Sequence, residues 1–141
     1  WKIHNDLYQV RNDVGAIVHA HSPSATALSI LRKPVPAFHY MVALIGGSQI
    51  PCADYATFGT QQLSDNIEKA MLGYKACLMA NHGMLAVGAQ LANAYRLAQE
   101  VESLCAQYSE AKRLGDIVLL SEQEMIEAKV AFSQYGQASH Q

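Results

Sequence analysis

The sequence lacks a concentration of charge of either sign. Its 141 residues include 10 Lys and Arg against 12 Asp and Glu, for a formal net charge of −2, and the basic residues form no cluster. Proteins that bind a nucleic-acid backbone usually carry a basic stripe along one face. We therefore expect no nucleic-acid partner. A small anionic substrate is compatible with this composition, because it needs only a few local donors.

Long apolar segments are also missing. Half of the residues are hydrophobic, but no uncharged apolar run approaches the roughly 18–20 residues that span a membrane. No segment has the pattern of a secretory signal peptide either. These absences predict a cytoplasmic protein with no membrane partner. The length is typical of one globular domain, which we expect to cover residues 1–141.

Cysteine is scarce and irregularly spaced. The chain has three cysteines, Cys52, Cys77 and Cys105, an odd number at wide intervals. This pattern excludes a disulfide framework and a zinc ribbon, and it favours reduced, buried thiols. A glycine-rich phosphate loop of the Walker or dinucleotide type is absent as well. The chemistry must therefore come from other residue types.

The apolar pattern predicts an α/β layered domain, because short apolar runs alternate with longer stretches of helical periodicity. Three sites suggest helix starts: Ser22 followed by Pro23, Thr60, and a capping box in which Ser121 precedes Glu124. Residues 38–45 fit either a strand or a short helix, and a polar tail follows from Tyr135. We expect helices over residues 1–12, 24–31, 61–72, 91–114 and 122–132, and strands over residues 16–21, 50–53, 76–79 and 84–87.

A pair of histidines ends the first expected strand. Side chains two residues apart point to the same face of a strand, so His19 and His21 are spaced to share one metal ion. His82 lies in an expected turn between two apolar strands and could supply a third imidazole. Three imidazoles with one open position form a catalytic zinc site, in which the ion acts as a Lewis acid. Manganese, iron or cobalt would accept the same ligands.

Other side chains have plainer interpretations. Tyr40 could donate a proton near a metal, although residue type alone favours core packing. By the same reasoning Phe58 and Phe132 are core or interface residues, and Tyr135 is a surface anchor. The remaining histidines, His4, His39 and His140, have no spacing that directs them to the pair.

Five segments in order carry a family resemblance. They are Ile17-Val18-His19-Ala20-His21-Ser22, His39-Tyr40-Met41, Ile50-Pro51-Cys52-Ala53, Tyr55-Ala56-Thr57-Phe58-Gly59-Thr60 and Asn81-His82-Gly83. With these the chain resembles the class II aldolase/adducin family from Trp1 to Gly136, and in particular its members that act on L-fuculose 1-phosphate. The resemblance implies a three-layer α/β/α fold with a central mixed, largely antiparallel sheet, of which this chain lacks the N-terminal part.

The resemblance also implies roles for single residues. His19, His21 and His82 align with three zinc ligands, and Tyr40 aligns with a catalytic tyrosine that acts across a subunit boundary. Phe58, Phe132 and Tyr135 align with residues that line the aldehyde part of the pocket. Members of the family are cyclic homotetramers with active sites between subunits, and they cleave a ketose 1-phosphate into dihydroxyacetone phosphate and an aldehyde.

One departure affects the expected activity. In the family a catalytic Glu directly precedes the residue that aligns with Trp1, and the residues that hold the substrate phosphate lie further upstream. The sequence starts at Trp1, without an initiator Met, so we expect it to be a fragment of a longer enzyme. We also expect the 141-residue chain alone to bind zinc weakly at best and to have no aldolase activity.

Several alternatives stay open at this point. A ribulose-5-phosphate 4-epimerase, a dehydratase or a decarboxylase of the same family would share the metal site, and a 5-deoxypentulose phosphate aldolase is a close variant. The alternative from another class is a non-catalytic adducin-like scaffold. Scaffolds of that kind are expected to have lost the metal histidines, whereas all three are present here.

Overall fold

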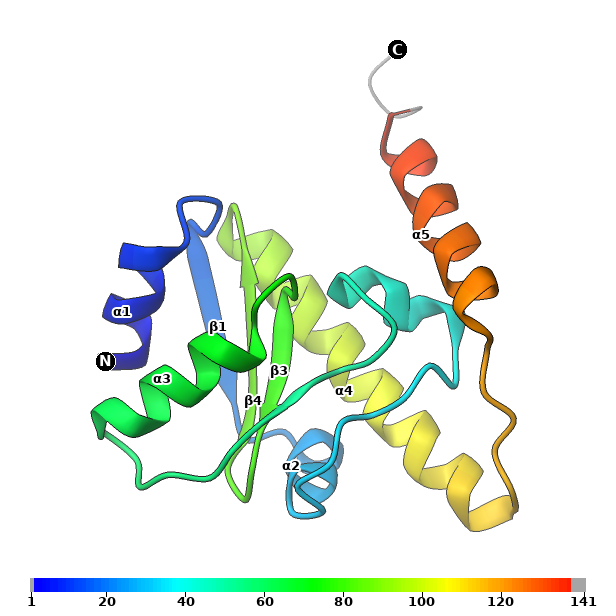
Figure 1. Ribbon diagram of the computed structural model, residues 1–141, viewed down its shortest axis with the longest axis horizontal. Helices are drawn as coiled ribbons and strands as arrows, with labels where there is room; N and C mark the ends of the chain where they lie inside the picture. The colour runs from blue at the N-terminus through cyan, green and yellow to red at the C-terminus, as the bar shows by residue number, and fades with distance from the viewer. Residues whose placement is uncertain (1, 138–141) are drawn as a thin grey trace.

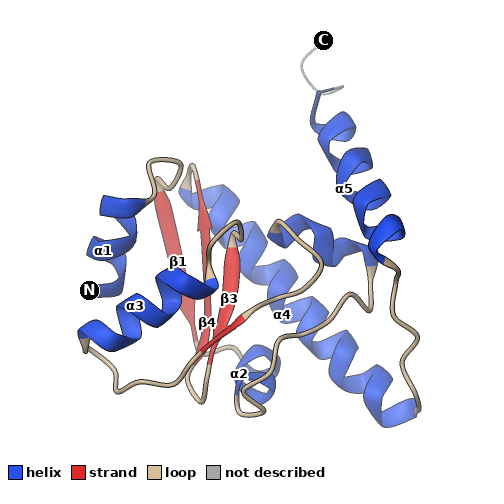
Figure 2. Ribbon diagram, in the orientation of Figure 1, coloured by secondary structure: helices blue, strands red, loops and turns tan. Residues whose placement is uncertain are grey.

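The computed structural model describes residues 2–137, with side chains described as far as Gln134, and shows one mixed sheet covered by helices (Figures 1 and 2). The expected alternation of strands and helices is confirmed. None of the described helices is long and apolar enough to cross a membrane. In chain order the elements are α1 (Lys2–Val10), β1 (Ala16–Ala20), α2 (Pro23–Ser29), the 3-10 helix η1 (Tyr40–Ile45), β2 (Cys52–Ala53), α3 (Gln61–Ala70), β3 (Ala76–Met79), β4 (Gly83–Gly88), α4 (Leu91–Leu114) and α5 (Glu122–Gln137).

The four strands lie in the order β1-β4-β3-β2. β4 pairs antiparallel with both β1 and β3, and β2 adds in parallel to β3. The sheet is therefore mixed and largely antiparallel, as expected. The register sets His19 opposite Leu85 and Ala20 opposite Met84, so the end of β1 lies beside the turn that joins β3 to β4.

The sheet separates two apolar cores because side chains alternate between its faces. On one face Leu78 and Met84 pack with residues of α2, α4 and η1. On the other face Met79 and Leu85 pack with Leu7 of α1 and with residues of α3. Figure 1 shows α1 and α3 on one side of the strands and α2 and α4 on the other, which gives the three layers.

The structure decides one element that the sequence left open, in favour of the short helix, and it corrects the predicted end of the last helix. Residues 40–45 form a 3-10 helix, in which the Met41 amide donates to Nδ1 of His39 at 3.2 Å. The last helix does not end at Phe132 but continues to Gln137, so Tyr135 lies within α5 and not in a polar tail. A single glycine costs a helix only about 1 kcal/mol relative to alanine, which was not enough to end α5 before Gly136.

Two of the three expected helix caps make the expected side-chain hydrogen bonds. The Leu63 amide donates to Oγ1 of Thr60 at 3.3 Å. Ser121 and Glu124 bond reciprocally, with the Ser121 amide 2.7 Å from the Glu124 carboxylate and the Glu124 amide 3.2 Å from the Ser121 hydroxyl.

The third cap is confirmed in its position but not in its side-chain hydrogen bond. Ser22 stands at the N-cap position of α2, but its side chain makes no capping bond. Glu102 of α4 instead accepts hydrogen bonds from the amides of Ser24 and Ala25, each at 2.8 Å. A carboxylate from a neighbouring helix thus caps α2 with both of its oxygens, and its negative charge suits the positive end of the helix dipole.

The three thiols are free, as expected. Cys77 and Cys105 are buried, and Cys52 is half-buried. Burial, followed by the charge of Asp54, raises the pKa of Cys52 to about 11. Cys52 is therefore a protonated, weakly nucleophilic thiol at neutral pH.

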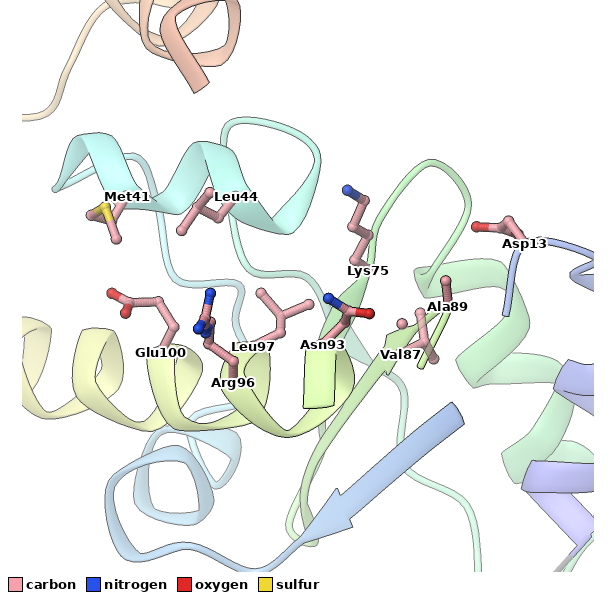
Figure 3. A pocket seen from close by; sticks show the side chains of 11 residues that line it. Asp13, Met41, Leu44, Lys75, Val87, Ala89, Asn93, Arg96, Leu97 and Glu100 are labelled. Carbon is pink, nitrogen blue, oxygen red and sulfur yellow. The ribbon is translucent and has the colours of Figure 1, made fainter. Parts of the chain in front are cut away.

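A cavity of ≈ 600 Å³ lies at the end of the β3–β4 hairpin opposite the turn (Figure 3). Lys75, which precedes β3, and Arg96 of α4 stand at this cavity together with the carboxylates of Asp13 and Glu100. Charges of both signs thus surround an apolar floor that includes Leu97. Nothing in this arrangement selects one kind of ligand.

Candidate metal centre

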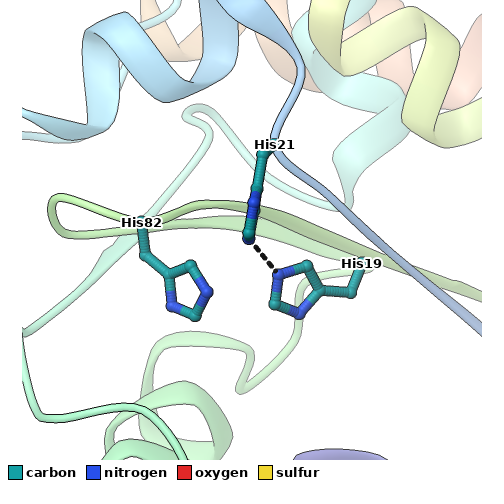
Figure 4. Close-up of side chains that lie close together, drawn as sticks. All are labelled: His19, His21 and His82. Atoms are coloured by element: carbon teal, nitrogen blue, oxygen red, sulfur yellow. Dashed lines mark hydrogen bonds between the residues drawn. The ribbon is translucent and has the colours of Figure 1, made fainter.

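Three histidines from two distant segments converge at one end of the sheet (Figure 4). His19 lies near the end of β1 and His21 directly follows it, while His82 lies in the turn between β3 and β4. Because β1 pairs with β4, the end of β1 and this turn are neighbours in space. Strand pairing therefore brings His82, 61 residues after His21, to the same point as the pair.

Gly83 makes this close approach possible. A Cβ at position 83 would lie 2.5 Å from the carbonyl oxygen of Ala20 and 3.0 Å from Cδ2 of the His21 ring. The first distance is too short for any side chain, and the contact is with backbone, which cannot rotate away. Glycine is thus needed for the turn to pass directly beneath the His21 ring.

The geometry of the three rings suits one metal ion. The Nε2 atoms of His19 and His21 are 2.9 Å apart, and one ligand nitrogen from each histidine lies within 4.8 Å of the others. The ring centroids are separated by 4.8–5.0 Å. Zinc–nitrogen bonds of about 2.0–2.1 Å in a tetrahedron set ligand nitrogens about 3.3 Å apart. Small side-chain rotations would bring all three nitrogens to that spacing.

The electrostatics also favour a cation. Burial, followed by the neighbouring His82 and His21, lowers the pKa of His19 to about 4. The pKa of His82 is lowered too, first by burial and then by His21. Neutral imidazole is the form that binds metals. Within residues 2–137 these three are the one group of three or more potential metal-binding side chains whose ligand atoms meet.

A cavity of ≈ 720 Å³ opens over the three histidines. Its far wall comes from α1 and α3, which cover the same face of the sheet. Phe58 lies at this cavity and is 81% exposed, so of the two expected places, core or interface, it does not occupy the core. The lining consists of Ile3, His4, His19, His21, Tyr55, Ala56, Phe58, Gly59, Leu63, Asn81 and His82.

Tyr40 and Phe132 do not line this cavity. Their rings stack on each other, with centroids 5.9 Å apart and planes 13° apart, and Tyr40 is 53% exposed. A single chain therefore brings together the three histidines and Phe58, but not Tyr40 and Phe132. The side chain of Tyr135 and the whole of His140 lie outside the described residues.

Sequence reasoning missed several residues around the site. His4 lines the cavity, and burial lowers its pKa, although its spacing in the sequence did not direct it toward the other histidines. Tyr55 and Asn81 also line the cavity, and Arg32 contacts both of them. Asn81 could have been noticed as the turn residue before His82, whereas no sequence signal points to Arg32.

Comparison with known proteins supports the family resemblance. Residues 1–109 match the sequence model of the Class II Aldolase and Adducin N-terminal domain family. The chain belongs to this family. The match covers every segment on which the resemblance was based and all three histidines.

Individual relatives are similar over almost the whole chain. The chain is 47% identical to 5-methylthioribulose-1-phosphate/5-deoxyribulose-1-phosphate aldolase of Rhodospirillum rubrum, over 96% of this chain and 62% of that protein. It is 44% identical to L-fuculose phosphate aldolase of Escherichia coli O6:H1, over 96% of this chain and 64% of that protein. A solved structure of L-fuculose 1-phosphate aldolase superposes with a TM-score of 0.90 at 44% identity, over 94% of this chain and 62% of that one. The chain thus spans a little under two thirds of the length of these relatives.

Proposed function

We propose that this chain is the metal-binding part of a class II aldolase that cleaves a ketose 1-phosphate into dihydroxyacetone phosphate and an aldehyde. The observation that carries the proposal is the convergence of His19, His21 and His82 in one cavity. The named relatives support it, because both are aldolases of sugar phosphates. The non-catalytic scaffold is disfavoured, since a scaffold has no need for three clustered imidazoles.

We propose zinc as the ion, because three nitrogen ligands with room left for a substrate oxygen are typical of catalytic zinc sites. When bound, zinc would polarise the ketose carbonyl and stabilise the negative charge that develops as the carbon–carbon bond breaks. His19, His21 and His82 would hold it. The residues around them would exclude bulk water from one side of the substrate, because Ile3 and Leu63 close the far wall with apolar surface.

Tyr40 is proposed to act in the active site of a neighbouring subunit. It is exposed and stacked on Phe132, and neither side chain lines the cavity of its own chain. Figure 1 shows α5 projecting away from the sheet, and its apolar residues Ile126 and Val130 are about half exposed. These features fit a homotetramer in which Tyr40 protonates the intermediate at an adjoining site, while Phe58, Phe132 and Tyr135 line the aldehyde part of the pocket.

The proposed general base is a glutamate that would stand immediately before Trp1. It is not among the 141 residues, and the groups expected to hold the substrate phosphate are not among them either. A polypeptide confined to these residues should therefore bind zinc weakly and release no triose phosphate. Sustained turnover by that polypeptide would refute the assignment of the base.

We propose that the substrate is a ketose 1-phosphate of the L-fuculose or 5-deoxypentulose type. An L-fuculose 1-phosphate type of substrate was expected from the motifs, whereas the Rhodospirillum rubrum relative is named for 5-methylthioribulose and 5-deoxyribulose 1-phosphates. All of these are ketose 1-phosphates whose cleavage releases dihydroxyacetone phosphate, and they differ in the aldehyde.

The experiment is a coupled assay of dihydroxyacetone phosphate formation by the full-length protein from L-fuculose 1-phosphate and from 5-deoxyribulose 1-phosphate. His82→Ala is the matched variant and should lose both bound zinc and turnover. Interconversion of pentulose 5-phosphates without release of triose phosphate would instead identify a 4-epimerase and overturn the aldolase proposal.

A further inference from the structure

Two residues with unusual backbone geometry contact each other beside the metal centre. Arg32 has φ +52° and Asn81 has φ +55°, and they are the two non-glycine residues with positive φ in the part of the chain that the structure describes. Their side chains meet although the residues are 49 positions apart, with Nε of Arg32 donating to Oδ1 of Asn81 at 2.6 Å. Such backbone conformations are unfavourable for a residue like arginine and persist only where surrounding contacts enforce them.

The two backbones are also joined through one acceptor. The carbonyl oxygen of Ser29 accepts from the Arg32 amide and from the Asn81 amide, each at 3.1 Å. Ser29 is fully buried, and its hydroxyl bonds to the carbonyl of Thr26 at 2.7 Å. The end of α2 thus anchors both residues through main-chain bonds, and the Arg32 side chain adds a third connection to Asn81.

Asn81 sets the position of His82. The His82 amide donates to the carbonyl of Met79 at 3.0 Å, which closes a four-residue turn with Asn81 as its third residue. A positive φ at that position is characteristic of a type II turn, in which glycine or asparagine is preferred. The direction in which the His82 ring leaves the turn therefore depends on how Asn81 is held.

Arg32 also contacts the other wall of the cavity. Its guanidinium carbon lies 5.3 Å from the centre of the Tyr55 ring, within the range of a cation–π contact. Tyr55 and Asn81 both line the cavity above the histidines. Arg32 thus bridges the loop that carries Tyr55 to the turn that carries His82, from a place outside the lining itself.

We propose that Arg32 is a positioning residue for the metal centre, which acts through its bond to Asn81 to hold His82 toward His19 and His21. This inference rests on the proposed function, because it assumes that the three histidines bind a metal ion. Residues that orient metal ligands commonly change metal affinity by 10- to 100-fold when they are removed. Since Arg32 acts through Asn81, we expect a loss of about tenfold.

The test is the binding of cobalt(II) to the metal-free, full-length protein, measured by titration of its visible absorption, because cobalt accepts the same ligands and reports their geometry. Arg32→Met removes the donor, and Asn81→Gly removes the acceptor while keeping a residue that tolerates positive φ. Each variant should bind cobalt about tenfold more weakly, with a shifted absorption band. The double variant should be no weaker than either single one, since both remove the same bond.

Two further variants separate positioning from general effects. Asn81→Asp keeps an acceptor for Arg32 and should bind cobalt at least as tightly as the wild type. Arg96→Met removes an exposed arginine at the other cavity and should change nothing. A role in stability alone would lower the melting temperature of Arg32→Met without moving the cobalt spectrum, and that outcome would overturn the proposal.

The remaining outcomes are also decisive. If Arg32→Met does not fold, the pair Asn81→Gly and Asn81→Asp carries the test, and equal cobalt affinity of these two would overturn the proposal. Normal cobalt binding by a folded Arg32→Met would overturn this inference alone. Failure of the wild type to bind cobalt would overturn the proposed metal site and this inference with it.

Discussion

Glu102 offers a quantitative test of how the segment that carries His19 and His21 is anchored. α2 begins two residues after His21, and its first turn is held by the Glu102 carboxylate through the amides of Ser24 and Ala25. Loss of a helix cap costs about 0.5–2 kcal/mol, and a charged acceptor lies toward the upper end. We expect Glu102→Ala to cost about 2 kcal/mol and Glu102→Gln, which keeps one neutral acceptor, about 1 kcal/mol.

Urea unfolding followed by far-UV circular dichroism measures these losses. With a denaturant slope of about 2 kcal/mol/M, the midpoints should fall by about 1 M for Glu102→Ala and about 0.5 M for Glu102→Gln. Glu100→Gln, two residues earlier on α4, is the matched control, because the Glu100 side chain makes no hydrogen bond or ion pair within the part of the chain that the structure describes. Its midpoint should stay within about 0.2 M of the wild type.

The pH dependence gives this prediction a second, independent check. Burial alone would raise the pKa of Glu102, but hydrogen bonding to its carboxylate, from the Ala25 amide first and then from groups of Ser22 and Ser24, outweighs burial and lowers the pKa. A group with a lowered folded pKa contributes stability above its unfolded pKa, about 4.3, and loses it as the pH falls through the folded value. The gap between wild type and Glu102→Gln should therefore be full at pH 7 and shrink below about pH 4. Equal midpoints at pH 7 would refute the capping role.

Two other predictions address the metal centre. Gly83→Ala should weaken zinc binding by at least about tenfold, because the added Cβ would lie 2.5 Å from the Ala20 carbonyl and press on the His21 ring. Equilibrium dialysis against zinc would measure the affinity. An unchanged affinity would show that the turn can move. Zinc at 100 times its dissociation constant should stabilise the full-length protein by about 2.7 kcal/mol, or roughly 5–10 °C in melting temperature, and EDTA should remove the gain. In His82→Ala the melting temperature should not respond to zinc, and a full response would mean that His82 is not a ligand.

Local sequence signals predicted most of the elements but not all of their bounds. The long apolar stripe of α4 and the caps at Thr60 and Ser121 are local patterns, and the structure confirms them. Residues 38–45 were ambiguous because a short apolar run fits both a strand and a helix, and the cap from His39 decides the matter. The cap of α2 could not be predicted, since Glu102 lies 78 residues from Ser24.

In the candidate site, too, the local features could be predicted from the sequence and the long-range ones could not. The spacing of His19 and His21 on a strand predicts a shared face, and this needs no knowledge of the rest of the fold. The arrival of His82 depends on which strand pairs with β1, and this long-range choice is not visible in a single sequence. The proposed role of Arg32 is harder still to predict from the sequence, because Arg32 acts through its bond to Asn81 in the turn before His82.

The elements around the histidines differ from those that carry Tyr40 and Phe132 in how their positions are fixed. His19 lies on the paired strand β1, His21 directly follows it, and His82 lies in the turn next to Gly83. The backbone of one chain therefore sets the positions of all three candidate ligands. Tyr40 lies at the start of η1, and Phe132 lies on α5, which projects from the sheet in Figure 1. Ligand geometry must be accurate to tenths of an ångström, whereas a proton donor has to be present only when substrate is bound. It is therefore consistent with the proposed chemistry that one chain brings the three histidines together and leaves Tyr40, the proposed proton donor, to contact between chains.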